Sequence, residues 1–147
     1  MTSTFIDTSG WACLFDARQP SNQTAIDHFK TLRNSRSRII TSNYVIAELI
    51  ALFDSPLRLP RSTIFTTIDT IKTNPYVEII HITPEIDTAA WNLCKARSDK
   101  PWSLVDCTSF VLMKQNNIQM ALTTDDLRSV FDHCHFEQAG FIRLLKS

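Results

Sequence analysis

Glycine is scarce in this sequence, which has two glycines and six prolines in 147 residues. A chain with so little glycine and proline is not typical of a flexible linker or a disordered segment. Its charges also balance, with 15 Lys and Arg against 15 Asp and Glu. No overall field therefore draws it to nucleic acid, and such binding would need a local basic patch. We expect one folded domain over residues 1–147, long enough to bury a proper core.

Paired cysteines and long apolar runs are missing as well. The four cysteines are far apart, and none forms a CxxC pair, which argues against a zinc site or a disulfide framework. We therefore expect reduced, buried thiols. The first residues lead directly into a strand-like run, without the basic and apolar stretches of a signal peptide or a membrane span. The sequence predicts a cytoplasmic protein.

Strand-like and helical patterns alternate along the chain. Apolar runs predict strands at 3–6, 38–41, 77–82, 119–122 and 141–144, and periodic patterns predict helices at 8–15, 23–32, 43–53, 62–72, 84–97 and 104–113. In the helix over 62–72 we expect Ile64, Phe65, Ile68 and Ile71 to face inward. Residues 127–136 fit at most one helical turn. The alternation predicts an α/β fold, a three-layer α/β/α sandwich with a central, mainly parallel sheet.

The segment 101–113 contains an acid in an unusual setting. Ser103 is a suitable helix N-cap, and Asp106 is the single charged residue among the ten that follow it. The Ser-x-x-Asp spacing is close to a capping box, in which the acid closes the helix end. An acid in so apolar a helix otherwise needs a partner, because desolvating a carboxylate is costly. Both interpretations remain open for Asp106 taken alone, and Ser109 lies on the same helix face.

Further acids lie where a parallel sheet would gather side chains. Asp7 follows the first strand, and Asp125 and Asp126 follow the fourth. The working site of such a sheet lies beyond the carboxyl ends of its strands, although each acid could instead cap a helix or lie in an exposed turn. Glu48 has apolar neighbours at all four i±3 and i±4 positions, which favours a role in a site over a structural ion pair.

Converging carboxylates repel one another, and a divalent cation relieves that repulsion. Oxygen ligands with few thiols or imidazoles suit Mg²⁺ or Mn²⁺. The chemistry that fits is phosphodiester hydrolysis, in which one ion, or a pair about 4 Å apart, activates a water and stabilises charge on the phosphate.

Four acidic motifs and a closing run carry a resemblance to a known family. They are Phe5-Ile6-Asp7-Thr8-Ser9, Glu48-Leu49, Trp102-Ser103-Leu104-Val105-Asp106-Cys107-Thr108-Ser109-Phe110, Ala121-Leu122-Thr123-Thr124-Asp125, and His135-Phe136-Glu137-Gln138-Ala139-Gly140-Phe141. In this order they resemble the motifs of PIN-domain ribonucleases, and VapC-type toxins in particular, over essentially the whole chain. The resemblance implies a PIN fold, a metal-dependent endoribonuclease that uses Mg²⁺ or Mn²⁺, an RNA substrate and a small cognate antitoxin.

Motif matching also implies individual roles. The catalytic and metal-binding acids would be Asp7, Glu48, Asp106 and Asp125, with hydroxyl support from Thr8, Ser109 and Thr123 or Thr124. The segment 126–134 resembles an insertion ahead of the His-Phe pair, so either Asp125 or Asp126 could supply the fourth acid. A soft-metal site at His133, Cys134 and His135 is disfavoured, because adjacent residues of an extended chain point to opposite sides.

Surface residues suggest how RNA and proteins would bind. Basic clusters occur at Lys30, Arg33, Arg36 and Arg38; at Arg58 and Arg61; and at Lys95, Arg97 and Lys100. Arg97 and Lys100 are the best candidates for RNA contact because their loop leads to Asp106, whereas we expect Trp102 to pack beneath that loop. The helices over 42–53 and 62–72 are more apolar than a small domain requires, so an exposed part could bind the antitoxin or form a homodimer.

Alternative functions fit the sequence less well. A non-catalytic PIN-like module that binds RNA or protein is disfavoured because all four acidic positions are filled. An aspartyl-phosphate phosphatase would have a second Asp two residues after Asp7, where Ser9 stands. A response-regulator receiver would have an acidic pair after the first strand, where Asp7 is the single acid.

Overall fold

The structure, a computed structural model that describes residues 2–124 and 134–145, contains a parallel five-stranded sheet. Its strand order is β3-β2-β1-β4-β5, and all four neighbouring pairs are parallel. The strands are β1 (Ser3–Ile6), β2 (Arg38–Ser42), β3 (Val77–Ile80), β4 (Met120–Leu122) and β5 (Ile142–Arg143). The predicted α/β class and parallel sheet are confirmed.

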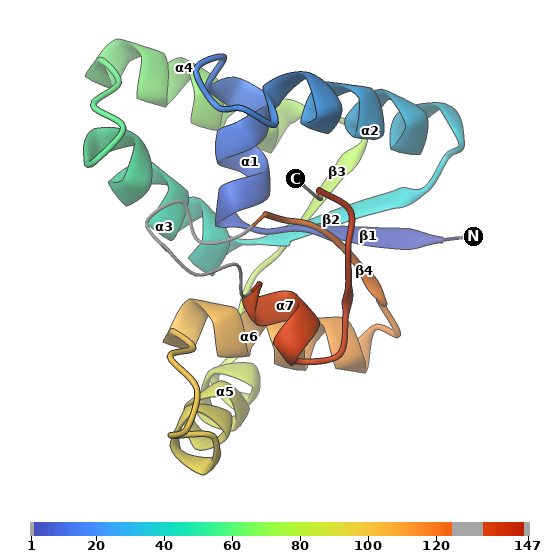
Figure 1. Ribbon diagram of the computed structural model, residues 1–147, viewed down its shortest axis with the longest axis vertical. Helices are drawn as coiled ribbons and strands as arrows, with labels where there is room; N and C mark the ends of the chain where they lie inside the picture. Colours follow the sequence, from blue (N-terminus) through green and yellow to red (C-terminus); the bar gives the residue numbers. More distant parts are fainter. Residues whose placement is uncertain (1, 125–133, 146–147) are drawn as a thin grey trace.

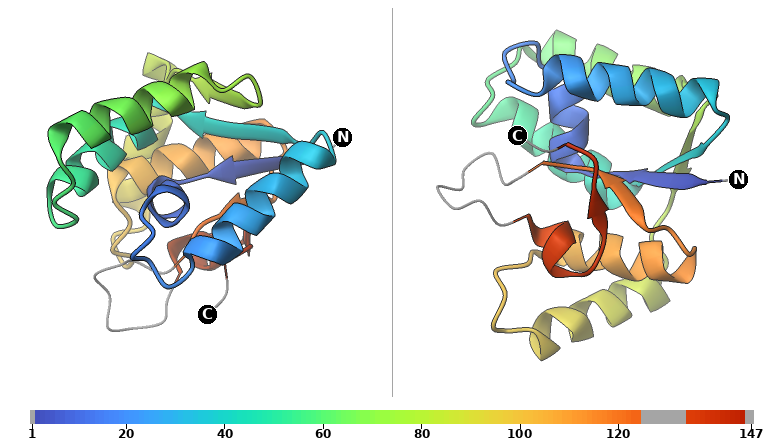
Figure 2. Two further views of the ribbon diagram at one scale, coloured as in Figure 1. Left: turned by 90° about the horizontal axis from the view of Figure 1, so that it is seen from above. Right: turned by 45° about the vertical axis from the view of Figure 1, so that its right-hand side comes forward.

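Helices cover both faces of this sheet (Figure 1). The helices are α1 (Thr8–Phe15), α2 (Asn22–Asn34), α3 (Asn43–Asp54), α4 (Arg61–Thr73), α5 (Pro84–Ala96), α6 (Leu104–Gln115) and α7 (His135–Gln138). Figure 2 shows α1, α2 and α4 on one face and α5, α6 and α7 on the other. Helix α3 contacts α1 and α4 as well as α6, so it joins the two helical layers. No helix in the described ranges has the length and apolar character needed to cross a membrane.

The centre of the core is strand β1, which lies between β2 and β4. Phe5 and Ile6 are completely buried, as expected for a parallel sheet covered on both faces. The Phe5 ring stacks on that of Phe136, with 6.3 Å between centroids. This contact attaches the short helix α7 to the middle of the sheet.

Helix α1 passes very close to the end of β4 at Gly10. A Cβ atom at this position would lie 1.9 Å from the backbone oxygen of Leu122. A side chain would therefore push the helix away from the strand, and only glycine permits this approach. The approach brings Asp7, which precedes α1, beside Thr123, which follows β4.

Several sequence predictions need correction, among them the last strand, because β5 spans Ile142–Arg143 and not 141–144. Phe65 was expected to face inward, but 53% of its surface is exposed, while Ile64, Ile68 and Ile71 are buried as predicted. One residue along a helix is a rotation of about 100°, so Phe65 turns away from the stripe that Ile64 begins, and the Arg61 guanidinium lies 5.0 Å from its ring centroid. Strand β3 ends at Ile80, two residues before the strand end predicted at Ile82. The backbone N–H of Ile82 donates to the side chain of Asn43 and not to a neighbouring strand.

Helix α7 was not assigned from the sequence, and residues 125–133 lie outside the described residues. All four cysteines are free thiols; Cys13, Cys107 and Cys134 are buried as predicted, whereas Cys94 is only partly buried. The Sγ atoms of Cys94 and Cys107 lie 3.0 Å apart, where α5 packs on α6. That residues 1–147 form a single PIN-like domain stays a prediction.

Candidate active site

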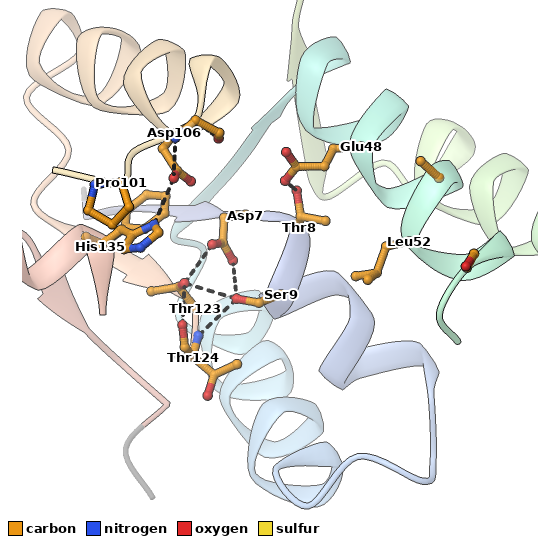
Figure 3. A pocket seen from close by; sticks show the side chains of 14 residues that line it. Asp7, Thr8, Ser9, Glu48, Leu52, Pro101, Asp106, Thr123, Thr124 and His135 are labelled. Atoms are coloured by element: carbon orange, nitrogen blue, oxygen red, sulfur yellow. Dashed lines mark hydrogen bonds and ion pairs between the residues drawn. The ribbon is translucent and has the colours of Figure 1, made fainter. Parts of the chain in front are cut away.

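A cavity of about 390 Å³ lies at the carboxyl edge of the sheet, where β1 and β4 end. The strand order runs outward from β1 to β2 and β3 on one side, and through β4 to β5 on the other. Ligands of parallel sheets bind at such a reversal of strand order. Figure 3 shows side chains from several elements around this cavity. It is lined by Asp7, Thr8, Ser9, Glu48, Ala51, Leu52, Ser55, Pro101, Ser103, Asp106, Thr123, Thr124, His135 and Phe136.

Asp7 is held by three hydrogen bonds to its carboxylate. The backbone N–H of Gly10 and the hydroxyl of Ser9 donate to Oδ1, each at 2.9 Å. The hydroxyl of Thr123 donates to Oδ2 at 2.7 Å. Asp7 therefore caps helix α1 and also lines the cavity, so its capping role does not compete with a role in the site.

The environment of Asp7 disfavours its charge. Burial, with a smaller contribution from the negative charge of Asp106, raises the pKa of Asp7 to about 7, although the hydrogen bonds from Thr123, Gly10 and Ser9 lower it. Within the part of the chain that the structure describes, no Lys or Arg forms an ion pair with Asp7. A cation in the cavity would favour the ionised form.

Asp106 enters the cavity from the first turn of α6. The hydroxyl of Ser103 accepts from the N–H of Asp106, and Asp106 Oδ2 accepts from the N–H of Ser103, both at 3.0 Å. The capping box inferred from the sequence is therefore present. The same Oδ2 lies 2.8 Å from Nδ1 of His135 on helix α7, and Figure 3 shows the two side chains facing each other.

Glu48 reaches the cavity from α3. The hydroxyl of Thr8 donates to Glu48 Oε1 at 2.6 Å, which joins the first turn of α1 to the middle of α3. Thr8 itself is buried. Glu48 thus points to the cavity and accepts a hydrogen bond from Thr8 there.

Some predicted residues do not line the cavity. Ser109 is 1% exposed, and its hydroxyl donates to the backbone oxygen of Val105 at 2.9 Å. Ser109 follows Asp106 by three residues on the same helix, so the two side chains point in directions that differ by about 60°. The side chain of Ser109 therefore points into the core. Asp125 and Asp126 lie outside the described residues, so the choice between them stays a prediction.

The two predicted RNA contacts also lie outside the cavity lining. The guanidinium of Arg97 pairs with Asp99, with Nε 3.0 Å from Oδ1, and lies 5.2 Å from the Trp102 ring centroid. Trp102 is buried, and its Nε1–H donates to Gln138. Trp102 therefore packs beneath the loop, as expected, and a role of Arg97 and Lys100 in RNA binding stays a prediction.

Sequence reasoning missed four polar residues of the cavity lining, Ser9, Ser55, Ser103 and His135. The hydroxyl of Ser9 donates to Asp7 and accepts from the N–H of Thr124. The position of Ser9, two residues after an acid at a strand end, is the sequence feature that indicates this contact. Ser103 was identified as a helix cap alone. His135 was considered for a soft-metal site, whereas the structure pairs it with Asp106.

The donors around this cavity are mainly oxygen atoms. The described residues contain no group of three His, Cys, Asp or Glu side chains that could hold an ion by themselves. Mg²⁺ often keeps several waters and uses only one or two carboxylates. The carboxylates of Asp7, Glu48 and Asp106, with the nearby hydroxyls, therefore suit a hydrated, hard divalent cation.

The PIN domain family model matches residues 4–133. Because this match spans most of the chain, the chain belongs to the PIN-domain family. The family assignment predicted from the acidic motifs is confirmed.

The individual relatives point to VapC nucleases. The chain is 29% identical over 141 residues to the 23S rRNA-specific endonuclease VapC20 of Mycobacterium tuberculosis, covering 95% of this chain and 96% of the relative. The crystal structure of VapC20, a sarcin–ricin loop cleaving toxin, matches with a TM-score of 0.76 at 28% identity over 95% of this chain and 97% of that one. The sequence-based recognition of a VapC-type PIN ribonuclease is confirmed.

A more distant solved structure shares the fold. FitAcB from Neisseria gonorrhoeae is 16% identical and matches with a TM-score of 0.63, covering 95% of each chain. The shared fold again covers nearly the whole length of the chain.

The raised pKa of Asp7 predicts a pH-dependent cost to stability in the absence of metal. An unfolded Asp ionises near pH 4, whereas the folded Asp7 ionises near pH 7, so the folded state loses stability as pH rises between these values. Asp7→Asn removes this cost. We expect its stability advantage over the wild type to grow by about 2 kcal/mol between pH 5 and pH 8, measured by urea unfolding in EDTA.

Asp69→Asn, the same change at an exposed residue of α4, is the matched control. An advantage of Asp7→Asn that is equal at the two pH values would contradict the burial argument.

Proposed function

We propose that this chain is a divalent-metal-dependent endoribonuclease and the toxin of a toxin–antitoxin pair. Its catalytic and metal-binding acids would be Asp7, Glu48, Asp106 and Asp125, with Asp126 as the alternative fourth acid. The observation that carries the proposal is the meeting of Asp7, Glu48 and Asp106 in one cavity. These acids come from three elements that are distant in the sequence.

The residues around the acids would prepare the site for its cation. Bound Mg²⁺ or Mn²⁺ would supply an activated water and stabilise negative charge on the scissile phosphate. Hydrogen bonds from Ser9, Gly10 and Thr123 hold the carboxylate of Asp7 in place. Carboxylates held in this way need little reordering when a ligand binds, which is how preorganised sites gain affinity and rate.

The preference for Mg²⁺ rests on the chemistry of the donors. Carboxylate and hydroxyl oxygens favour hard cations, and the same donors accept Mn²⁺. Thr8, which donates to Glu48, and Thr123 would be supporting residues. Ser109 would act indirectly, through the packing of α6, because its hydroxyl bonds within the helix.

An RNA loop is the substrate class that we propose. The relative VapC20 acts on 23S rRNA and cleaves its sarcin–ricin loop, which makes that loop the first substrate to test. Access to such an RNA is consistent with the cytoplasmic location predicted from the sequence. Lys100 and Arg97 would contact RNA outside the cavity. Lys100→Gln should therefore raise KM without changing kcat, and an unchanged KM would argue against this contact.

Helices α3 and α4 would provide the surface for an antitoxin or a second copy of the chain. Ile50 on α3 is 39% exposed and Phe65 on α4 is 53% exposed, and the two helices contact each other. Exposed large apolar side chains on neighbouring helices favour an interface. The purified chain should have the mass of a dimer by light scattering, and a strict monomer would contradict the homodimer.

Removing the charge of Asp106 tests the proposed activity. Asp106→Asn keeps an oxygen that can accept from Ser103 but loses the negative charge needed for a cation. We expect cleavage of a sarcin–ricin loop oligonucleotide to fall at least 100-fold, with the unfolding temperature in EDTA changed by only a few degrees. The assay compares Mg²⁺, Mn²⁺ and EDTA, and Asp69→Asn serves as the control.

Full cleavage by Asp106→Asn, or wild-type cleavage in EDTA, would overturn the proposal. RNA binding without cleavage of any tested RNA in Mg²⁺ and Mn²⁺ would instead favour the non-catalytic module.

A further inference from the structure

One histidine contacts a carboxylate of the candidate active site. Nδ1 of His135 lies 2.8 Å from Asp106 Oδ2, although the two residues are 29 positions apart. Both side chains are largely buried, with 22% of His135 and 18% of Asp106 exposed. Both also line the cavity, and Figure 3 shows the imidazole facing the carboxylate.

The position of His135 is fixed by its neighbours in the chain. Cys134 and Phe136, on either side of it, are buried. The Phe136 ring packs edge-on against Phe110 of α6, with 4.9 Å between centroids. Gln138, at the end of α7, accepts a hydrogen bond from Trp102 Nε1. Helix α7 is therefore tied to α6 and to the loop before it, and it presents His135 in one place.

The capping box of α6 does not require this histidine. Ser103 and Asp106 satisfy each other's backbone N–H groups without it. Oδ2 of Asp106 thus accepts from the Ser103 N–H and also meets Nδ1 of His135. Two donors directed at one carboxylate oxygen fix the rotation of the group and leave Oδ1 to face another partner.

We propose that His135 is a positioning residue that orients the Asp106 carboxylate toward a divalent cation in the cavity. This inference rests on the proposed metal-dependent function. An ionised carboxylate can only accept hydrogen bonds, so Nδ1 of His135 carries the hydrogen. Hydrogen bonds to metal-binding carboxylates orient these groups, and losing such a partner commonly weakens metal affinity by 10- to 100-fold.

Three substitutions separate the Nδ1 hydrogen bond from the bulk of the side chain. His135→Leu retains volume but removes the donor. His135→Asn places an amide N–H near the position of Nδ1, whereas the longer His135→Gln places it near Nε2. His81→Leu makes the same change as the first variant at an exposed histidine that does not line the cavity.

Metal binding by the apo protein is the main readout, measured as the Mn²⁺ dissociation constant by isothermal titration calorimetry. We expect His135→Leu and His135→Gln to raise it about tenfold. His135→Asn should stay within about threefold of the wild type, and His81→Leu should be unchanged. The kcat of RNA cleavage at limiting metal should follow the same order, and unfolding in EDTA shows which variants are folded.

Wild-type affinity in either His135→Leu or His135→Gln would overturn the inference, as would an Asn variant as weak as the Gln variant. If His135→Leu does not fold, the comparison of Asn with Gln decides. Asp106→Asn separates this inference from the proposed function. Wild-type Mn²⁺ affinity in Asp106→Asn would contradict the proposed metal site itself. Loss of Mn²⁺ affinity in Asp106→Asn, together with wild-type affinity in His135→Gln, would contradict only the role of His135.

Discussion

The burial of a carboxylate at the end of the central strand is the constraint on which the rest of the site depends. Asp7 follows β1, the middle strand of the sheet, so its backbone cannot move away from the core. Burial and the nearby charge of Asp106 raise its pKa to about 7. A carboxylate whose surroundings disfavour its charge lowers the stability of the folded protein. Natural proteins keep such groups where function requires them. A divalent cation would reverse the penalty by favouring ionised Asp7.

Hydroxyl and N–H groups hold the acids in place. Thr8 donates to Glu48, Thr123 to Asp7, and the N–H of Ser103 to Asp106. These donors are neutral, so they orient the carboxylates without neutralising them as Lys or Arg would. Donors of this kind leave the negative charge of Asp7 available to a cation. The close approach of α1 to β4 at Gly10 brings Asp7 and Thr123 together.

Much of this arrangement could be predicted from local sequence. The strand-to-helix position of Asp7, the capping box of Asp106 and the apolar surroundings of Glu48 all involve residues within four positions of each other. Contacts that depend on tertiary packing could not be predicted in this way. His135 meets Asp106 because Phe136 is inserted beside Phe110. Ser109 was expected at the site from motif matching and from the helix face that it shares with Asp106, but it is buried and its hydroxyl donates to the backbone of its own helix.

The central claim is that these acids hold a divalent cation, and a crystal soaked in Mn²⁺ tests it most directly. The anomalous signal of the ion locates it independently of the protein atoms. The account predicts an ion in the cavity with oxygens of Asp7 and Asp106 within about 2.5 Å and with its remaining ligands supplied by water or further acids. Mn²⁺ bound only elsewhere, or held in the cavity without either carboxylate, would contradict the account.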